Sequence, residues 1–190
     1  MGAAATLASP LLGEGRAVDA LASGMDYHVT MHSDGFEEAM GDASYALSLK
    51  QPWAALLVHG HKTIEIRRWP TARRGRVLIH ASRQSDPRPA AWSLVPEDLQ
   101  AAASLRGGIV GSAELADCVS YEGRAAFVAD ARRHLNDPRW FRLPLMYGFV
   151  FADARPLAFR PCRGWFRFFQ VTAESATRLD AVTNGQGEFF

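Results

Sequence analysis

Residues 45–82 read YALSLKQPWAALLVHGHKTIEIRRWPTARRGRVLIHAS, and the order of the structural elements follows from them. The opening YALSL predicts a short strand, since its residues alternate and favour extended backbone. Pro52 suits the first turn of an apolar helix, which Gly60 ends as a C-terminal cap. KTIEIR at 62–67 predicts a second strand and RVLIHA at 76–81 a third. The stretch therefore indicates strand, helix, strand, strand.

The rest of the chain adds further strands and a helical insertion. The patterns predict a helix over 89–105, a long strand over 109–119, a helical excursion within 121–142, and three aromatic strands at 147–152, 155–159 and 165–171. Six or so strands with one early helix do not alternate as a βαβ repeat. We therefore expect an α+β fold, mainly β: a mixed β-barrel with the early helix packed at its rim and a helical insertion.

The two ends of the chain differ from this middle part. Residues 1–44 are rich in Ala and Gly and carry 1 basic and 7 acidic side chains, which predicts a flexible acidic tail. A domain over 45–172 and a polar tail over 173–190 follow. There is no secretory leader pattern and no run of about 18 apolar residues, so we expect a cytoplasmic protein without a membrane partner.

The formal net charge of +1 conceals one strongly positive segment. Residues 50–88 carry 9 basic and 2 acidic side chains. Such a block attracts a phosphate backbone, although a solvated arginine-rich face would have the same composition. The only two lysines of the chain, Lys50 and Lys62, both lie in it. Two lysines among so many arginines suggest that a compact ammonium group is required at these positions.

Charged, polar and aromatic side chains that could bind or react with a ligand are most concentrated around Lys62. Cations here can hold phosphate, and the Glu65 carboxylate can accept a hydrogen bond from a base or move a proton. Strict alternation would place Lys62 with the isoleucines, so we expect it at the entrance of the strand. Trp53 and Trp69 could stack on bases. The competing interpretation is structural: Glu65 pairs with Arg67 and both tryptophans lie in the core.

The sequence predicts neither a metal site nor a cofactor. His59 and His61 form a pair without a third ligand, which is more typical of a polar helix end. Cys118 and Cys162 are far apart and form no CxxC motif, so we expect core residues or free thiols.

Residues 45–82 closely resemble the ASCH domain, named for activating signal cointegrator 1 homology. The resemblance rests on the SLKQPWAALLVHG opening, on G-x-K-x-x-E-x-R as Gly60, Lys62, Glu65 and Arg67, on the Trp69 that follows, and on RRGRVLIHAS. Later, GGIVGSAELADCVS and YGFVFADARPLAF resemble further strands of that family, so the similarity spans about 45–171. It implies a PUA-like barrel with a cleft between barrel and helix.

The resemblance is closest to the coactivator-type branch and implies binding of RNA or another single-stranded nucleic acid. In that interpretation Lys50, Lys62 and Arg67 hold phosphates, and Glu65 positions Lys62 or accepts from a base. Trp53 or Trp69 stacks. Polar contacts would come from Ser48, Gln51 and Ser82, and His80 could face the cleft.

Two alternatives stay open at this stage. One branch of the family resembles amidohydrolases that act on modified nucleosides such as N4-acetylcytidine, with a catalytic lysine, threonine and glutamate, and another is described as metal-dependent ribonucleases. Lys62 falls on the catalytic lysine, but Glu65 stands where the threonine would be, so an enzyme would have to use Lys62 and Glu65. The other alternative is a protein-interaction domain whose cleft has lost its ligand.

Overall fold

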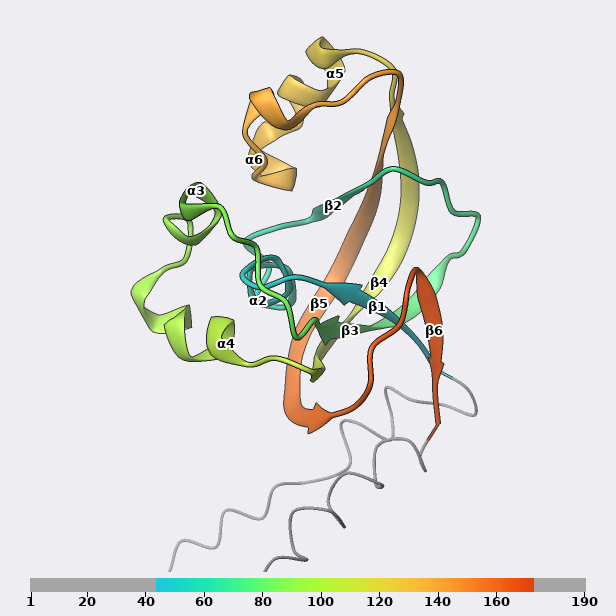
Figure 1. Cartoon of the computed structure of the whole chain (residues 1–190). Helices are drawn as coiled ribbons and strands as arrows, with labels where there is room; N and C mark the ends of the chain where they lie inside the picture. The colour runs from blue at the N-terminus through green and yellow to red at the C-terminus, as the bar shows by residue number, and fades with distance from the viewer. Residues whose placement is uncertain (1–43, 173–190) are drawn as a thin grey trace, which may run out of the picture. The chain divides into compact units, whose positions relative to one another are not determined.

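The computed structural model describes residues 44–172, in which short helices lie to one side of a six-stranded mixed sheet (Figure 1). The predicted tails, 1–44 and 173–190, lie outside the described residues apart from Ser44. Within this range no helix is long and apolar enough to cross a membrane.

The elements follow one another along the chain as β1 Ser44–Leu49, α2 Trp53–Val58, β2 Ile64–Arg67, β3 Gly75–Ala81, α3 Pro89–Trp92, η1 Glu97–Leu99, α4 Gln100–Ser104, β4 Gly108–Tyr121, α5 Arg124–Ala129, α6 Ala131–His134, η2 Pro138–Trp140, β5 Met146–Pro161 and β6 Phe168–Val171. The long strands β4 and β5 pair side by side from the helical insertion at one end to the β5–β6 connection at the other (Figure 1).

The strand order is β2-β5-β4-β3-β1-β6. β1 pairs with β3 in parallel, and the other neighbours are antiparallel. The α+β class is confirmed. The closed barrel is not confirmed, because among residues 44–172 the sheet ends on one side with β2 and on the other with β6.

Two predicted elements differ from the structure. The helix expected over 89–105 is divided into α3, η1 and α4, because Pro96 lacks an amide hydrogen and disfavours a helical residue before it. The strands expected at 147–152 and 155–159 form the single strand β5, which stays paired with β4 through several register shifts. The last predicted strand is shorter than expected: β6 begins at Phe168, which leaves Trp165 outside the sheet.

Helix α2 is buried along its whole length and packs into the main hydrophobic cluster. Its contact with β4 depends on Gly111, since a Cβ there would lie 2.4 Å from a methyl carbon of Val58 and 2.6 Å from the carbonyl oxygen of Arg155. Gly60 after the helix has φ +79°, which agrees with the predicted C-terminal cap. The close approach fixes α2 against the sheet and therefore fixes the two segments that flank it.

The parallel pairing of β1 and β3 brings their carboxyl ends to the same edge of the sheet. Ser48 is paired with His80 in register, and Lys50 and Ser82 follow directly after the two strands. Segments that lie far apart in the sequence thus meet at this edge, where open sheets commonly bind ligands.

Candidate functional site

A pocket of about 680 Å³ opens at the carboxyl ends of β1 and β3. Its walls come from β1, β2, β3, the start of α2, the segment after β3, the helical insertion and the β5–β6 connection. The lining residues are Ser48, Lys50, Trp53, Glu65, Ile66, Arg67, His80, Ser82, Arg83, Gln84, Asp86, Arg88, Asn136, Arg163, Gly164, Trp165, Phe166 and Arg167. A pocket of this size can hold a nucleotide-sized ligand.

The pocket lining is strongly basic. Six of its residues carry a positive charge and two carry a negative one, and both carboxylates pair with an arginine. The positive charges belong to Lys50, Arg67, Arg83, Arg88, Arg163 and Arg167. Such a surface concentrates phosphate-bearing ligands.

Lys62, Glu65 and Arg67 meet as a chain of charges, which includes the Glu65–Arg67 pair of the structural interpretation. The Lys62 Nζ atom lies 3.4 Å from one carboxylate oxygen of Glu65, and the other oxygen lies 3.3 Å from Arg67 Nη2. Arg67 Nη2 also donates to the carbonyl oxygen of Ser48 at 2.7 Å. The Arg67 Nε atom is buried without a hydrogen-bond partner, which leaves one donor at the pocket wall unsatisfied.

Lys62 itself lies behind the pocket wall. It precedes β2, as expected, but is only 1% exposed, and its Nζ donates to the carbonyl oxygen of His134 at 2.6 Å. The same atom lies 5.0 Å from the centroid of the Trp53 ring. Burial lowers the pKa of Lys62, and the neighbouring Glu65 carboxylate counteracts this only in part. Lys62 is thus a support beneath Glu65 and Trp53 and not part of the lining.

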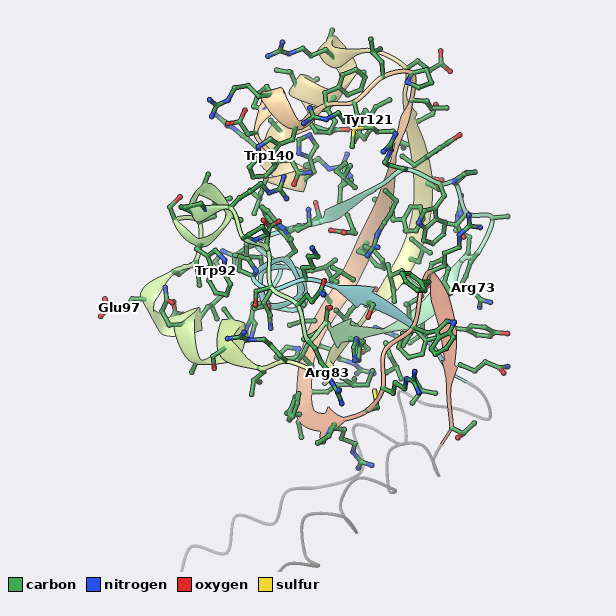
Figure 2. The ribbon with its side chains drawn as sticks, viewed as in Figure 1. Arg73, Arg83, Trp92, Glu97, Tyr121 and Trp140 are labelled. Atoms are coloured by element: carbon green, nitrogen blue, oxygen red, sulfur yellow. The ribbon has the colours of Figure 1, made fainter. Side chains whose placement is uncertain are left out.

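Trp53 forms one wall of the pocket and is held by Asp86. Its Nε1 donates to Asp86 Oδ2 at 2.7 Å, and Arg88 pairs with the same carboxylate. Burial alone would raise the pKa of Asp86, but the hydrogen bonds from Arg88 and Trp53 outweigh it and lower the pKa to about 2. The Arg88 guanidinium also lies 3.6 Å over the ring of Trp140, which Figure 2 labels on the helical insertion. This network joins the insertion to the segment after β3.

On the side facing the β5–β6 connection, Ser48 and His80 form a hydrogen-bonded pair. His80 Nε2 lies 3.2 Å from the carbonyl oxygen of Cys162, so Nε2 carries the proton and Nδ1 accepts from the Ser48 hydroxyl at 2.6 Å. Burial lowers the pKa of His80, which favours this neutral form. Gly164 lies against the pair, since a Cβ there would be 2.3 Å from His80 Cε1.

Three of the eight residues predicted to contact nucleic acid lie outside the lining: Lys62, Gln51 and Trp69. Gln51 is fully buried, where its Nε2 donates to the carbonyl oxygens of Ala102 and Leu105 and its Oε1 accepts from the amide of Ala55. It ties α2 to the end of α4.

Trp69 packs on the sheet instead of facing the pocket. Its ring centroid lies 4.8 Å from that of Phe149 and 5.6 Å from that of Phe168, and the Arg167 guanidinium lies 5.3 Å from it. Trp69 therefore supports Arg167, which does line the pocket.

The sequence reasoning missed two pocket segments. One is the segment after β3 with Arg83, labelled in Figure 2, and with Asp86 and Arg88. The other is the connection Arg163–Arg167, of which residues 165–167 were predicted to belong to the strand 165–171. Its sequence RGWFR places two adjacent aromatic rings between two arginines, a combination found on nucleic-acid-binding surfaces that could have been recognised.

The chain is similar to a known domain family, to two relatives and to solved structures. A family model described as the ASCH domain matches residues 47–151. Activating signal cointegrator 1 of Homo sapiens is 34% identical over 107 residues, and the protein of the same name in Mus musculus matches equally. These matches cover 50% of this chain but 17% of the relatives, so the chain spans about a sixth of their length.

Among solved structures, ASCH from Zymomonas mobilis is similar with a TM-score of 0.51 at 16% identity, covering 73% of this chain and 94% of that chain. A mutant form of the same Zymomonas mobilis protein gives a TM-score of 0.50 at 17% identity and covers 95% of that chain. At this identity the likeness concerns the fold alone.

Proposed function

The chain belongs to the ASCH domain family, and from this premise we propose that its pocket binds single-stranded nucleic acid, RNA in particular, without chemical turnover. The observation that carries the proposal is the charge of the lining, six basic against two acidic residues around a cavity of nucleotide size. Such a lining draws in phosphates and releases their counterions.

The groups inside the pocket have complementary roles in this proposal. Lys50 and Arg83 are exposed at the pocket and contact phosphates. Arg67 stays bound to the carbonyl oxygen of Ser48 through Nη2 and adds its positive charge to the pocket wall. Glu65 offers an acceptor to a base amino group or a ribose hydroxyl, the group that distinguishes RNA from DNA. Lys62 acts through Glu65 without touching the ligand.

The hydrolase alternative is not favoured by the geometry. It requires Lys62 to reach the substrate, whereas the Nζ atom is covered and donates to the carbonyl oxygen of His134. Both carboxylate oxygens of Glu65 are engaged by cations, one by Lys62 at 3.4 Å and the other by Arg67 at 3.3 Å. We therefore propose binding as the function of this site.

The experiment is a fluorescence-anisotropy titration of the full chain with labelled 12-nucleotide RNA, DNA of the same sequence, and the corresponding duplexes, at several salt concentrations. Arg83→Gln removes a cation of the pocket, and Arg76→Gln is its matched control, because Arg76 is exposed in the same basic segment but outside the lining. We expect Arg83→Gln to weaken RNA binding about fivefold to tenfold and to reduce the salt slope by about 0.7. Arg76→Gln should change affinity less than twofold. Binding that is indifferent to salt, or equal losses in both variants, would refute the proposal.

A further inference from the structure

The connection between β5 and β6 exposes two aromatic rings at the wall of the pocket. The Trp165 side chain is 58% exposed and that of Phe166 is 87% exposed. Large exposed aromatic groups in adjacent positions mark binding surfaces. Trp165 is also the only exposed one of the five tryptophans in the chain, all of which lie in the described part.

The backbone beneath these rings is fixed on both sides. Cys162 is buried, its amide donates to Gly107 and its carbonyl oxygen accepts from His80. Gly164 is pressed against His80 and Ser48, and β6 begins at Phe168. The rings therefore project from a held backbone, so little conformational entropy is lost when a ligand settles on them.

The charge around the rings indicates the chemistry of the ligand. Arg163 and Arg167 flank the two aromatic residues in sequence, and both arginines are exposed and line the pocket. The Arg163 guanidinium lies 5.2 Å from the Trp165 ring centroid. An apolar protein partner would not need two guanidinium groups beside the rings, whereas bases attached to phosphates match both features.

We infer that Arg163–Arg167 forms a stacking subsite on the exposed wall of the pocket, where unpaired bases stack on Trp165 and Phe166 while Arg163 and Arg167 contact their phosphates. This inference rests on the proposed function and names its substrate class. In a duplex the faces of interior bases are covered by their neighbours, so the subsite selects single strands. The ligand is a strand of at least three nucleotides, one of which lies against Glu65 and Arg67 in the same pocket while others stack on the rings.

The test separates stacking from simple apolar contact. Trp165→Leu and Phe166→Leu keep an apolar side chain without a π-face, Trp165→Tyr and Phe166→Tyr restore the ring, and Leu143→Ala is the control, because Leu143 is 75% exposed but lies outside the pocket lining. Each variant is titrated with cytidine 5′-monophosphate and with single-stranded RNA of two to eight nucleotides. Each variant is also titrated with oligonucleotides in which two adjacent nucleotides are abasic. Combining loss of the bases with loss of the ring gives a double-mutant cycle that measures the coupling between ring and base.

We expect each leucine variant to bind strands of three or more nucleotides about tenfold more weakly, with the tyrosine variants within about twofold to threefold of the original chain. Cytidine 5′-monophosphate should lose less affinity than these strands in each leucine variant, because a single nucleotide cannot occupy the rings and the inner wall of the pocket at the same time. Abasic substitution at the stacked positions should weaken binding to the original chain and have little effect on the leucine variants. Single-stranded RNA should also quench Trp165 fluorescence.

Failure of the inference and failure of the proposed function give different results. If the leucine variants bind long strands normally while Arg83→Gln weakens their binding, the pocket binds nucleic acid and stacking on Trp165 and Phe166 is refuted. If no strand binds in a salt-dependent way, the proposed function itself fails. If the leucine variants change only the oligomeric state in size-exclusion chromatography, the rings contact another copy of the chain and the inference is overturned.

Discussion

Replacing Lys62 by methionine should cost stability and leave affinity almost unchanged. Methionine is unbranched and only one heavy atom shorter than lysine, so little packing is lost in a position that is 1% exposed. It leaves the buried carbonyl oxygen of His134 without its donor, which costs about 1–3 kcal/mol. Glu65 also loses one cation but keeps Arg67 at 3.3 Å, and removal of a buried ammonium offsets part of the loss. The expected net destabilisation is about 2–3 kcal/mol.

The assay is urea unfolding at pH 7.5 and 25 °C, followed by tryptophan fluorescence, together with RNA titration of the folded variant. Lys50→Met is the matched control, since the other lysine of the chain is exposed at the pocket. It should lose less than about 0.5 kcal/mol in stability but weaken RNA binding and reduce the salt slope by about 0.7. If Lys62→Met loses less than about 1 kcal/mol of stability, the reasoning about the buried hydrogen bond is wrong. If the folded variant binds RNA about ten times more weakly while Lys50→Met does not, Lys62 contacts the ligand and the reasoning about its supporting role is wrong.

Three further predictions concern the frame of the pocket. Gly164→Ala forces the β5–β6 connection away and should destabilise the fold by about 1–3 kcal/mol, whereas Gly123→Ala, where nothing lies within 4 Å, should be nearly neutral in the same urea assay. His134 is fully buried, and burial lowers its pKa, so the unfolded chain binds more protons than the folded chain near this pH. The free energy of unfolding should therefore fall as the pH drops below about 6.5. A constant free energy of unfolding down to about pH 5 would contradict this. Trp53→Phe removes the donor to Asp86, so the pKa of Asp86 should rise above about 2 in an NMR titration, with a loss of about 1 kcal/mol. An unchanged titration would show that Arg88 alone sets this pKa.

The sequence predicted the framework of the site because its signals are local. Strands β1, β2, β3 and β4 follow from alternation, and α2 is bounded by Pro52 and Gly60. The entrance position of Lys62 also follows from the period of a strand, since the residue would otherwise share a face with the isoleucines.

The positions that failed depend on contacts between distant segments. Nothing in the sequence near Lys62 reveals that the carbonyl oxygen of His134, 72 residues away, accepts from its ammonium group. Likewise Gln51 is polar but buried, because α4 and the residue after it supply two carbonyl oxygens to its amide. The aromatic run ending at Val171 favours a strand by composition, yet Trp165 and Phe166 lie before the start of β6 and remain exposed.

The pocket is completed late in synthesis, because the first and last strands of the described chain pair with each other. β1 meets β6 with Ala46 opposite Phe169, so the sheet acquires its final partner only after nearly all of the described chain has been made. Contacts over such a sequence separation form slowly, because loop closure must precede them. The connection with Trp165 immediately precedes β6 and is anchored by its docking. A ribosome-bound chain that has not yet released β6 would therefore hold an incomplete pocket.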